Sequence, residues 1–180
     1  MKNTKRFVLK NINIDVCILT KEQDSKNFLM VALDGNKQVG YCSFFFENSS
    51  CKINRIAITN KDFLGKGIGT TMFNAMEQFA HKNDIKYLEG LFIPRGYDDA
   101  WQRTAKFYER HDMKTFENDF DYGDRQEISK HVENLGEEYD VPVVVNKLAF
   151  EEIDHYNNFV KDLFCSTSKD SKAENPEIEL

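Results

Sequence analysis

The chain has 180 residues, 41% of them hydrophobic and 30% charged, which suits one domain with a substantial core and excludes disorder along the whole length. Its net charge of −6 argues against general nucleic-acid binding, which needs a basic face, and a negative field would attract a cationic substrate such as an amine. No segment approaches the roughly 20 apolar residues needed to cross a membrane, and the basic N-terminus lacks a signal-type apolar run.

The first third of the chain predicts an antiparallel meander of strands. A mostly apolar stretch covers 7–19, with polar interruptions at Lys10-Asn11 and at Asp15. The run 28–33 ends in the hairpin signal Asp34-Gly35-Asn36-Lys37, after which 39–46 is the returning strand. The next strand, 51–58, alternates, so we expect two faces, one with Asn54, Ile56 and Ile58 and the other with Ile53, Arg55 and Ala57.

After Gly69 the apolar period changes from that of a strand to that of a helix, which ends around Asn83-Asp84. A buried strand is predicted over 87–93 and a second helix over 98–111. Strand, helix, strand and helix in this order imply a right-handed crossover and a locally parallel pair of strands.

The last third is less regular. The stretch 117–140 is acidic, turn-rich and weakly patterned, and 141–148 is a β-branched strand that Pro142 places at an edge or a strand start. An amphipathic C-terminal helix is predicted from Phe150, Ile153, Tyr156, Val160 and Leu163. Because 166–180 is polar, we expect it to be disordered, which leaves a single domain over 1–165.

The most informative segment is a glycine-rich loop between the strand at 51–58 and the first helix. It reads Leu64-Gly65-Lys66-Gly67-Ile68-Gly69-Thr70. Alternate glycines allow positive φ angles and bring backbone N–H groups close to a ligand. The first N–H groups of a helix also lack internal partners and carry partial positive charge. The loop therefore predicts a site for an anion, and a diphosphate is the natural guest.

Other interpretations of this loop rest on different motifs. A phosphate-binding loop of the NTPase type ends in Gly-Lys-Ser/Thr, whereas Lys66 lies between glycines. The dinucleotide motif Gly-x-Gly-x-x-Gly needs a glycine where Thr70 stands, and the preceding meander fits that fold badly. A strand-helix connection that binds nothing is the third alternative.

The segment resembles the coenzyme A signature Arg/Gln-x-x-Gly-x-Gly/Ala of the GNAT acetyltransferases, and Phe107-Tyr108-Glu109 resembles the family's Phe-Tyr-Glu element. The resemblance covers residues 53–116 well and is topological elsewhere. It implies the fold class: α/β, with a mixed, mainly antiparallel central sheet that is flanked by helices and split between two central strands. This chain would have truncated N-terminal helices and an added C-terminal helix.

The resemblance also implies the cosubstrate and the reaction. Acetyl-coenzyme A would bind with its pyrophosphate on the loop and its pantetheine arm along the strand end, and its acetyl group would pass to an amine of a small molecule or a peptide. Leu64 stands where the family usually has Arg or Gln, which removes one contact that Lys66 partly replaces. The residues expected to bind the cosubstrate are Ile58, Thr59, Leu64, Gly65, Lys66, Gly67, Ile68, Gly69, Thr70 and Trp101.

Two residues are candidates for catalysis. The resemblance makes Tyr108 the general acid that protonates the departing thiolate, and a phenol pKa of about 10 beside a thiol pKa of about 8.5 suits this transfer. A core aromatic is the alternative role for Tyr108. Glu89 is the candidate base because its apolar surroundings would raise its pKa, although a solvated carboxylate or an ion pair with Arg55 is equally open. His111 is expected to be a favourable cation at a helix C-terminus.

Two further hypotheses remain beside the N-acetyltransferase: a coenzyme A-binding sensor or interaction module without catalysis, and a nucleotide-binding protein of another fold. The four cysteines contain no Cys-x-x-Cys pair and no histidine at ligand spacing, so we expect no metal. We expect a reduced, cytoplasmic protein with no nucleic-acid or membrane partner. The C-terminal helix leaves a homodimer open.

Overall fold

The computed structural model describes residues 3–92, 99–117, 126–147 and 178–179. Its helices include the α-helices α1 (Ile68–Lys82) and α2 (Asp99–Arg110) and the short 3-10 helices η1 (Lys61–Phe63) and η2 (Glu137–Tyr139). The strands of the described residues are β1 (Lys5–Leu9), β2 (Ile12–Thr20), β3 (Asn27–Asp34), β4 (Lys37–Glu47), β5 (Ser50–Ile58), β6 (Tyr87–Phe92), β7 (Lys114–Glu117), β8 (Gln126–His131), β9 (Val143–Val145) and β10 (Ile178–Glu179).

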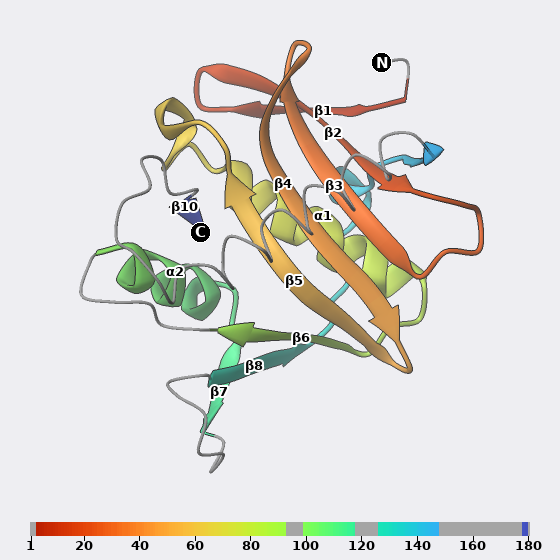
Figure 1. Cartoon of the computed structure of the whole chain (residues 1–180), viewed down its shortest axis with the longest axis vertical. Coiled ribbons are helices and arrows are strands. Elements are labelled where there is room, and N and C mark those ends of the chain that lie inside the picture. The colour runs from red at the N-terminus through yellow and green to blue at the C-terminus, as the bar shows by residue number, and fades with distance from the viewer. Residues whose placement is uncertain (1–2, 93–98, 118–125, 148–177, 180) are drawn as a thin grey trace, which may run out of the picture.

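One mixed sheet contains all these strands, in the order β1-β2-β3-β4-β5-β6-β8-β7 (Figure 1). The pairs from β1 to β5 are antiparallel, which confirms the predicted meander. β5 and β6 are parallel, with α1 as the crossover between them, as the strand-helix-strand order predicts. β9 pairs in parallel with β2, and β10 pairs antiparallel with β5.

The stretch 7–19, expected as one interrupted apolar run, belongs to two strands. β1 and β2 form a hairpin in which Leu9 pairs with Ile12. Lys10 lies in the turn with a φ of 52°, a left-handed conformation that lets the chain reverse within two residues. The polar pair Lys10-Asn11 is therefore a turn, and the β1–β2 hairpin becomes an edge of the sheet.

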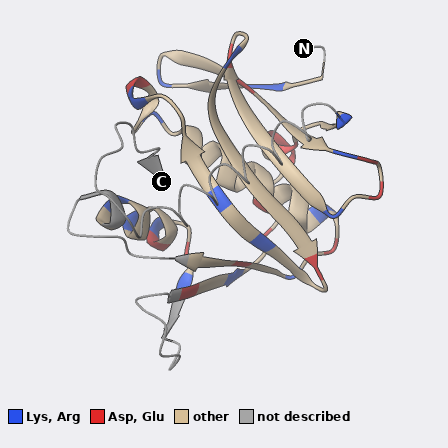
Figure 2. Cartoon of the chain, viewed as in Figure 1, with Lys and Arg blue, Asp and Glu red and all other residues tan. Residues whose placement is uncertain are grey.

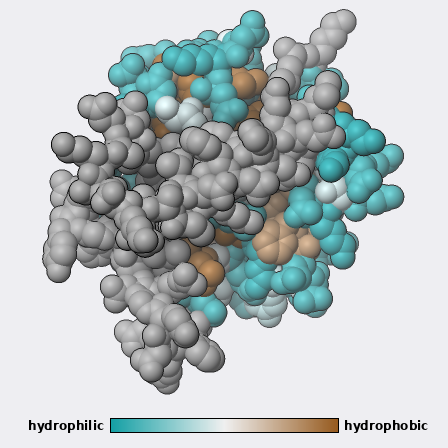
Figure 3. All heavy atoms as spheres, in the orientation of Figure 1, coloured by the Kyte–Doolittle hydropathy of each residue, from teal (hydrophilic) through white to brown (hydrophobic). Residues whose placement is uncertain are grey.

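The main core lies between the sheet and α1. The helix buries its apolar stripe, including Met72, Phe73 and Met76, against inward-facing side chains of the strands. The other face of the sheet carries a second, smaller buried cluster of Cys17, Leu19, Leu29, Val31, Tyr41 and Ala57. Consecutive residues of β2 and β3 alternate between the two clusters, as expected for a sheet covered on both faces. The described surface in Figure 3 is mainly hydrophilic, with small hydrophobic areas.

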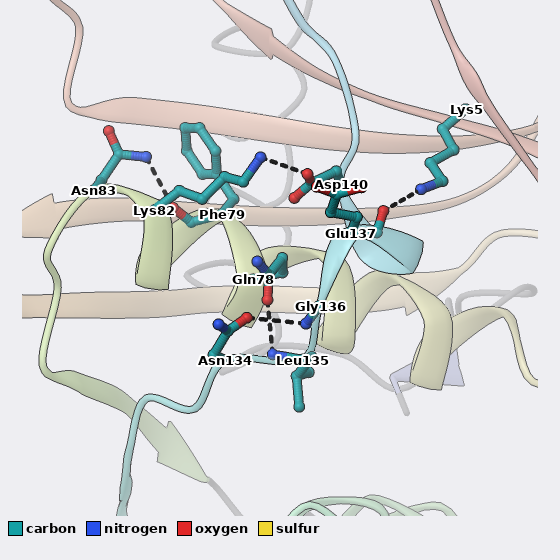
Figure 4. Close-up of polar contacts among 10 residues, drawn as sticks. All are labelled: Lys5, Gln78, Phe79, Lys82, Asn83, Asn134, Leu135, Gly136, Glu137 and Asp140. Atoms are coloured by element: carbon teal, nitrogen blue, oxygen red, sulfur yellow. Dashed lines mark hydrogen bonds and ion pairs between the residues drawn. The ribbon is translucent and has the colours of Figure 1, made fainter.

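The segment after β8 is fastened to α1 by polar contacts. The buried Gln78 accepts a hydrogen bond from the backbone N–H of Leu135 at 2.7 Å, and Lys82 pairs with Asp140 (Figure 4). The buried carboxylate of Glu77 pairs with Lys130 of β8 at 2.9 Å. Buried polar groups need such partners, and these contacts bind β8 and η2 to the core.

The last third departs from the prediction in several places. The weakly patterned 117–140 contains β8 and η2, and the predicted strand 141–148 shortens to β9. Among the described residues no α-helix precedes α1, which agrees with truncated N-terminal helices. The predicted helix from Phe150 to Leu163 lies outside the described residues. Of 166–180, where disorder is expected, the structure describes Ile178–Glu179, and these residues pair with β5 beyond the predicted domain end.

Candidate active site

The central strands β5 and β6 separate halfway along β5. Their parallel pairing runs from Ser50–Tyr87 to Ile53–Gly90 and ends there. At the same point the β4–β5 register shifts, because Ser43 pairs with Arg55 and Phe44 with Ile53, which leaves Asn54 as an extra, bulged residue. A β-bulge bends a strand and increases its twist. The bulge at Asn54 therefore accounts for the split that the fold prediction placed between two central strands.

The bulge also corrects the predicted faces of β5. Strict alternation would place Ile53 on one face of β5 and Ile56 and Ile58 on the other, yet all three belong to the main core beside α1. Asn54, predicted to share the face of Ile56, is exposed. One extra residue reverses the alternation on its two sides, so Ile53 and Ile56 reach the same face.

Beyond the bulge, the backbone groups of Thr59 face β4 and those of Ile58 face away from it. The N–H of Thr59 donates to the carbonyl oxygen of Val39 at 3.0 Å, and its hydroxyl donates to the carbonyl of Gln38 at 3.2 Å. Because backbone groups alternate in direction along a strand, those of Ile58 point away from β4, toward the split. The N–H of Thr59 is therefore already bonded within the sheet, and Thr59 as a cosubstrate-binding residue stays a prediction.

The glycine-rich loop follows at the same end of β5. After η1 the chain turns through Gly65 and Gly67, whose φ angles of 69° and 91° lie in the left-handed region that suits glycine. The first bond of α1 runs from the N–H of Thr71 to the carbonyl of Gly67 at 2.9 Å. The N–H groups of Ile68, Gly69 and Thr70 precede that bond, so they lack an acceptor within the helix and add to its positive end.

The loop has room for an anion. A Cβ atom built on Gly65 or Gly67 would meet no other atom within 4 Å, so the space beside these two residues is open. Leu64 is half-buried and packs against the main core. The ammonium of Lys66 lies over the ring of Phe63, 5.3 Å from its centroid. The open loop and the positive helix end fit a pyrophosphate bound through backbone groups.

Lys10, in the turn of the β1–β2 hairpin, also contacts this loop. Its ammonium donates to the carbonyl oxygen of Gly65 at 2.8 Å. The left-handed turn of the β1–β2 hairpin thus brings a cation to the loop, in which Leu64 stands where the resembled coenzyme A signature has Arg or Gln. Sequence reasoning missed Lys10, because 55 positions separate the two residues and no local pattern links them.

Tyr108 belongs to α2, which borders the split. Its half-buried ring meets Phe107 edge to face, with centroids 5.4 Å apart, and packs against the main core. α2 contacts β10, and β10 pairs with the end of β5 (Figure 1). The helix of Tyr108 and the strand end at Ile58 therefore flank the same two-residue strand. Trp101 also belongs to α2, and its side chain is outside the described part of the structure.

Glu89 has surroundings different from those expected. Its carboxylate accepts a hydrogen bond from the Ser50 hydroxyl at 2.7 Å and pairs with Lys52, both from the paired end of β5. The hydrogen bond from Lys52 lowers the pKa of Glu89 and outweighs burial, which would raise it. The expected rise in pKa is therefore wrong, and the ion pair is with Lys52 and not with Arg55. A carboxylate held this way is a weak proton acceptor, so Glu89 as a base stays a prediction that this geometry disfavours.

His111 is a half-buried, neutral residue that packs beside the core, and it is not the expected helix-end cation. Its ring stacks on Phe73 with centroids 4.1 Å apart and lies 4.7 Å from Phe107. Burial, assisted by the nearby charge of Lys130, lowers the pKa of His111 to about 4. At neutral pH the imidazole therefore contributes packing and carries no charge.

The low pKa of His111 predicts a loss of stability in acid. The unfolded chain binds the proton near pH 6.5 and the folded chain near pH 4, so this stabilisation is complete above pH 6.5 and disappears as the pH falls to about 4. After allowance for partial exposure, we expect the free energy of unfolding to fall by roughly 2 kcal/mol. Urea titrations of the native protein and of His111→Phe across this range measure the difference. His131→Phe, an exposed ring against Tyr87, is the control that should behave like the native protein.

In the view of Figure 2, basic and acidic segments are mixed over the strands and α2, without one large basic area. Within 3–92, 99–117, 126–147 and 178–179, no three His, Cys, Asp or Glu residues gather as metal ligands. The described helices are also too short or too polar to cross a membrane.

Comparison with known proteins gives one family. Residues 25–112 match the family model of the acetyltransferase (GNAT) domain, a range that includes the glycine-rich loop and Tyr108. No curated protein matches the sequence.

Two solved structures with a similar fold share little sequence with this chain. PaiA N-acetyltransferase from Thermoplasma acidophilum, in complex with coenzyme A, has 16% identity and a TM-score of 0.50 over 57% of this chain and 59% of its own. A GNAT-family acetyltransferase from Staphylococcus aureus Mu50 has 12% identity and a TM-score of 0.50 over 63% of this chain and 72% of its own. At such identities the likeness shows a shared fold, and the GNAT fold prediction is confirmed.

Proposed function

We propose that this chain transfers an acetyl group from acetyl-coenzyme A to an amine. The premise is that residues 25–112 form an acetyltransferase domain of the GNAT family. The observation that carries the proposal is the meeting of two features at one end of β5. There the strand departs from β6, and the glycine-rich loop places the open N-terminus of α1 directly after it. Acetyl-coenzyme A suits both features, because its diphosphate would bind at the N-terminus of α1 and its extended arm would lie along the strand.

The backbone would hold the cosubstrate. The N–H groups of Ile68, Gly69 and Thr70 would donate to the pyrophosphate, and Ile58 would offer one N–H and one carbonyl to the amides of the arm. The arm would lie beside β5 as an additional strand. Its thioester would then sit between β5 and α2, where Tyr108 is. Acetyl-coenzyme A supplies the activated acyl carbon when it is bound.

Tyr108 would serve as the proton donor in the transfer. The neutral amine nitrogen bonds to the acyl carbon while the carbon–sulfur bond breaks, and the Tyr108 hydroxyl gives its proton to the sulfur. The proton that the nitrogen loses restores the phenol through solvent, so the products are an amide and the free thiol. The acceptor is an amine of a small molecule or a peptide, consistent with the net charge of −6.

The alternative is a coenzyme A-binding sensor on the same fold. Two observations favour it: Leu64 removes a side-chain contact to the pyrophosphate, and Lys52 lowers the basicity of Glu89. Calorimetry with acetyl-coenzyme A, coenzyme A and ATP, followed by thiol release with a panel of amines, tests both functions. Binding of the two coenzyme A compounds with thiol release supports the enzyme. Binding without release favours the sensor, and binding of ATP alone contradicts both.

Lys10 should contribute to the affinity for the cosubstrate. Its ammonium holds the Gly65 carbonyl and adds positive charge at the loop, so Lys10→Met should weaken acetyl-coenzyme A binding about threefold to tenfold, as expected for a partly screened charge. The loss should shrink at high salt. Calorimetry at two salt concentrations measures both effects. Lys37→Met, an exposed lysine in the β3–β4 hairpin, should change neither, and equal affinities for all three proteins would exclude Lys10 from the site.

A further inference from the structure

The split beside β5 is already paired to another part of the chain. β10 lies antiparallel to the end of β5, with Ile178 opposite Ile58 and Glu179 opposite Ala57. Both pairs are beyond the point at which β6 leaves β5. Figure 1 shows β10 between β5 and α2, and it contacts both elements. A backbone strand from a distant part of the sequence therefore occupies the edge of β5 at the mouth of the split.

The direction of the backbone groups shows which pair makes the hydrogen bonds. Thr59 is bonded to Val39 of β4, so Ile58 directs its N–H and carbonyl to the opposite side, where Ile178 lies. Ile178 and Ile58 are thus the pair that exchanges both bonds. Glu179 lies opposite Ala57, whose groups face β4, so the N–H of Glu179 points away from β5.

We propose that the edge of β5 at Ile58 is a binding site for an extended peptide segment, that β10 is its occupant, and that β10 and acetyl-coenzyme A exclude each other there. The proposal rests on the proposed function, which assigns the same Ile58 groups to the pantetheine arm. Strand addition to a sheet edge uses backbone hydrogen bonds, which the amides of a peptide and of an extended pantetheine arm both provide. One N–H and one carbonyl of Ile58 cannot serve both partners at once.

This competition lowers the apparent affinity of the chain for its cosubstrate. A two-residue strand makes few bonds, so β10 must open often enough for the cosubstrate to enter. The measured dissociation constant is the intrinsic constant divided by the fraction of molecules in which the edge is open. Any segment or condition that stabilises β10 on β5 would weaken cosubstrate binding, and one that removes β10 would strengthen it.

The test changes one backbone donor in the full chain. Proline has no N–H, so Ile178→Pro removes the donor that faces the Ile58 carbonyl. We expect acetyl-coenzyme A, titrated by calorimetry, to bind about threefold to tenfold more tightly to this variant. Without cosubstrate, the amide hydrogen of Ile58 should exchange faster in the variant than in the native protein. Glu179→Pro removes an N–H that points away from β5, so it should leave both measurements unchanged.

The affinity for acetyl-coenzyme A and the exchange rate of the Ile58 amide together distinguish a failure of the competition from a failure of the proposed function. Faster Ile58 exchange together with tighter binding supports the competition. Equal affinities in the native protein and Ile178→Pro overturn the inference and leave the proposed function intact. Unchanged Ile58 exchange also overturns it. If neither protein binds acetyl-coenzyme A, the proposed function fails and the competition with it.

Discussion

Replacing Gly67 with leucine should weaken acetyl-coenzyme A binding by at least about 100-fold. Gly67 has a φ of 91°, and the space in front of it is open in the protein, so a side chain there would project into the place of the pyrophosphate without clashing with the chain itself. A 100-fold loss is about 2.7 kcal/mol, the size expected for the loss of one or two charge-assisted hydrogen bonds. Calorimetric titration of the purified variant measures it.

The control for Gly67→Leu is Gly35→Leu. Gly35 lies in the β3–β4 hairpin with a φ of 60°, and a Cβ there would likewise meet no atom within 4 Å. Both variants force leucine into a left-handed conformation at a cost of about 1–2 kcal/mol, so they should lose similar stability. Only Gly67→Leu should lose affinity. If the two variants bind acetyl-coenzyme A equally well, the loop is not the pyrophosphate site.

Tyr108→Phe should lower the turnover number about 10²-fold to 10³-fold and leave the dissociation constant of acetyl-coenzyme A nearly unchanged. The substitution removes the proposed proton donor and keeps the ring that packs edge to face on Phe107. General acid catalysis typically contributes a rate factor of about 10² to 10⁴. Thiol release under saturating amine measures the turnover, and calorimetry measures the affinity.

A second tyrosine separates the loss of an acid from the loss of any hydroxyl. Tyr139 of η2 stacks on Phe7, with ring centroids 6.2 Å apart, and belongs to the segment after β8. Tyr139→Phe should therefore turn over at the native rate. If Tyr108→Phe turns over at the native rate, Tyr108 is a core aromatic and not the general acid.

Local patterns were enough to predict the elements nearest the site. The Asp34–Lys37 turn, the strand after it and the glycine-rich loop before α1 each depend on neighbouring residues, and the structure has all of them. The parallel β5–β6 pair followed from the order of the elements alone. A glycine-rich loop between a strand and a helix is a local signal, so the candidate site could be located before its geometry was known.

The bulge at Asn54 could not be predicted from the alternation of β5. Strand alternation assumes one residue for each partner, and nothing in the local sequence marks the position at which two residues oppose one. Because of the bulge, Ile53 lies in the main core, and β5 separates from β6 beyond Ile53. The split that defines the site is therefore a property of three neighbouring strands.

Contacts between distant residues account for the other differences. Lys10 reaches Gly65 only because the β1–β2 hairpin folds over the loop, and Lys52 reaches Glu89 only because β5 and β6 lie in parallel register. The low pKa of His111 likewise depends on burial by α1 and α2. Such shifts depend on desolvation and neighbouring charges, which sequence spacing does not report.

The central claim is that the backbone amides at the start of α1 bind the pyrophosphate of coenzyme A. The most direct measurement is the change in backbone amide chemical shifts when the isotope-labelled protein is titrated with coenzyme A. We predict that the largest changes occur at Gly67, Ile68, Gly69 and Thr70, with none at the Gly35 turn. Saturation with coenzyme A that leaves these four amides unshifted would contradict the claim.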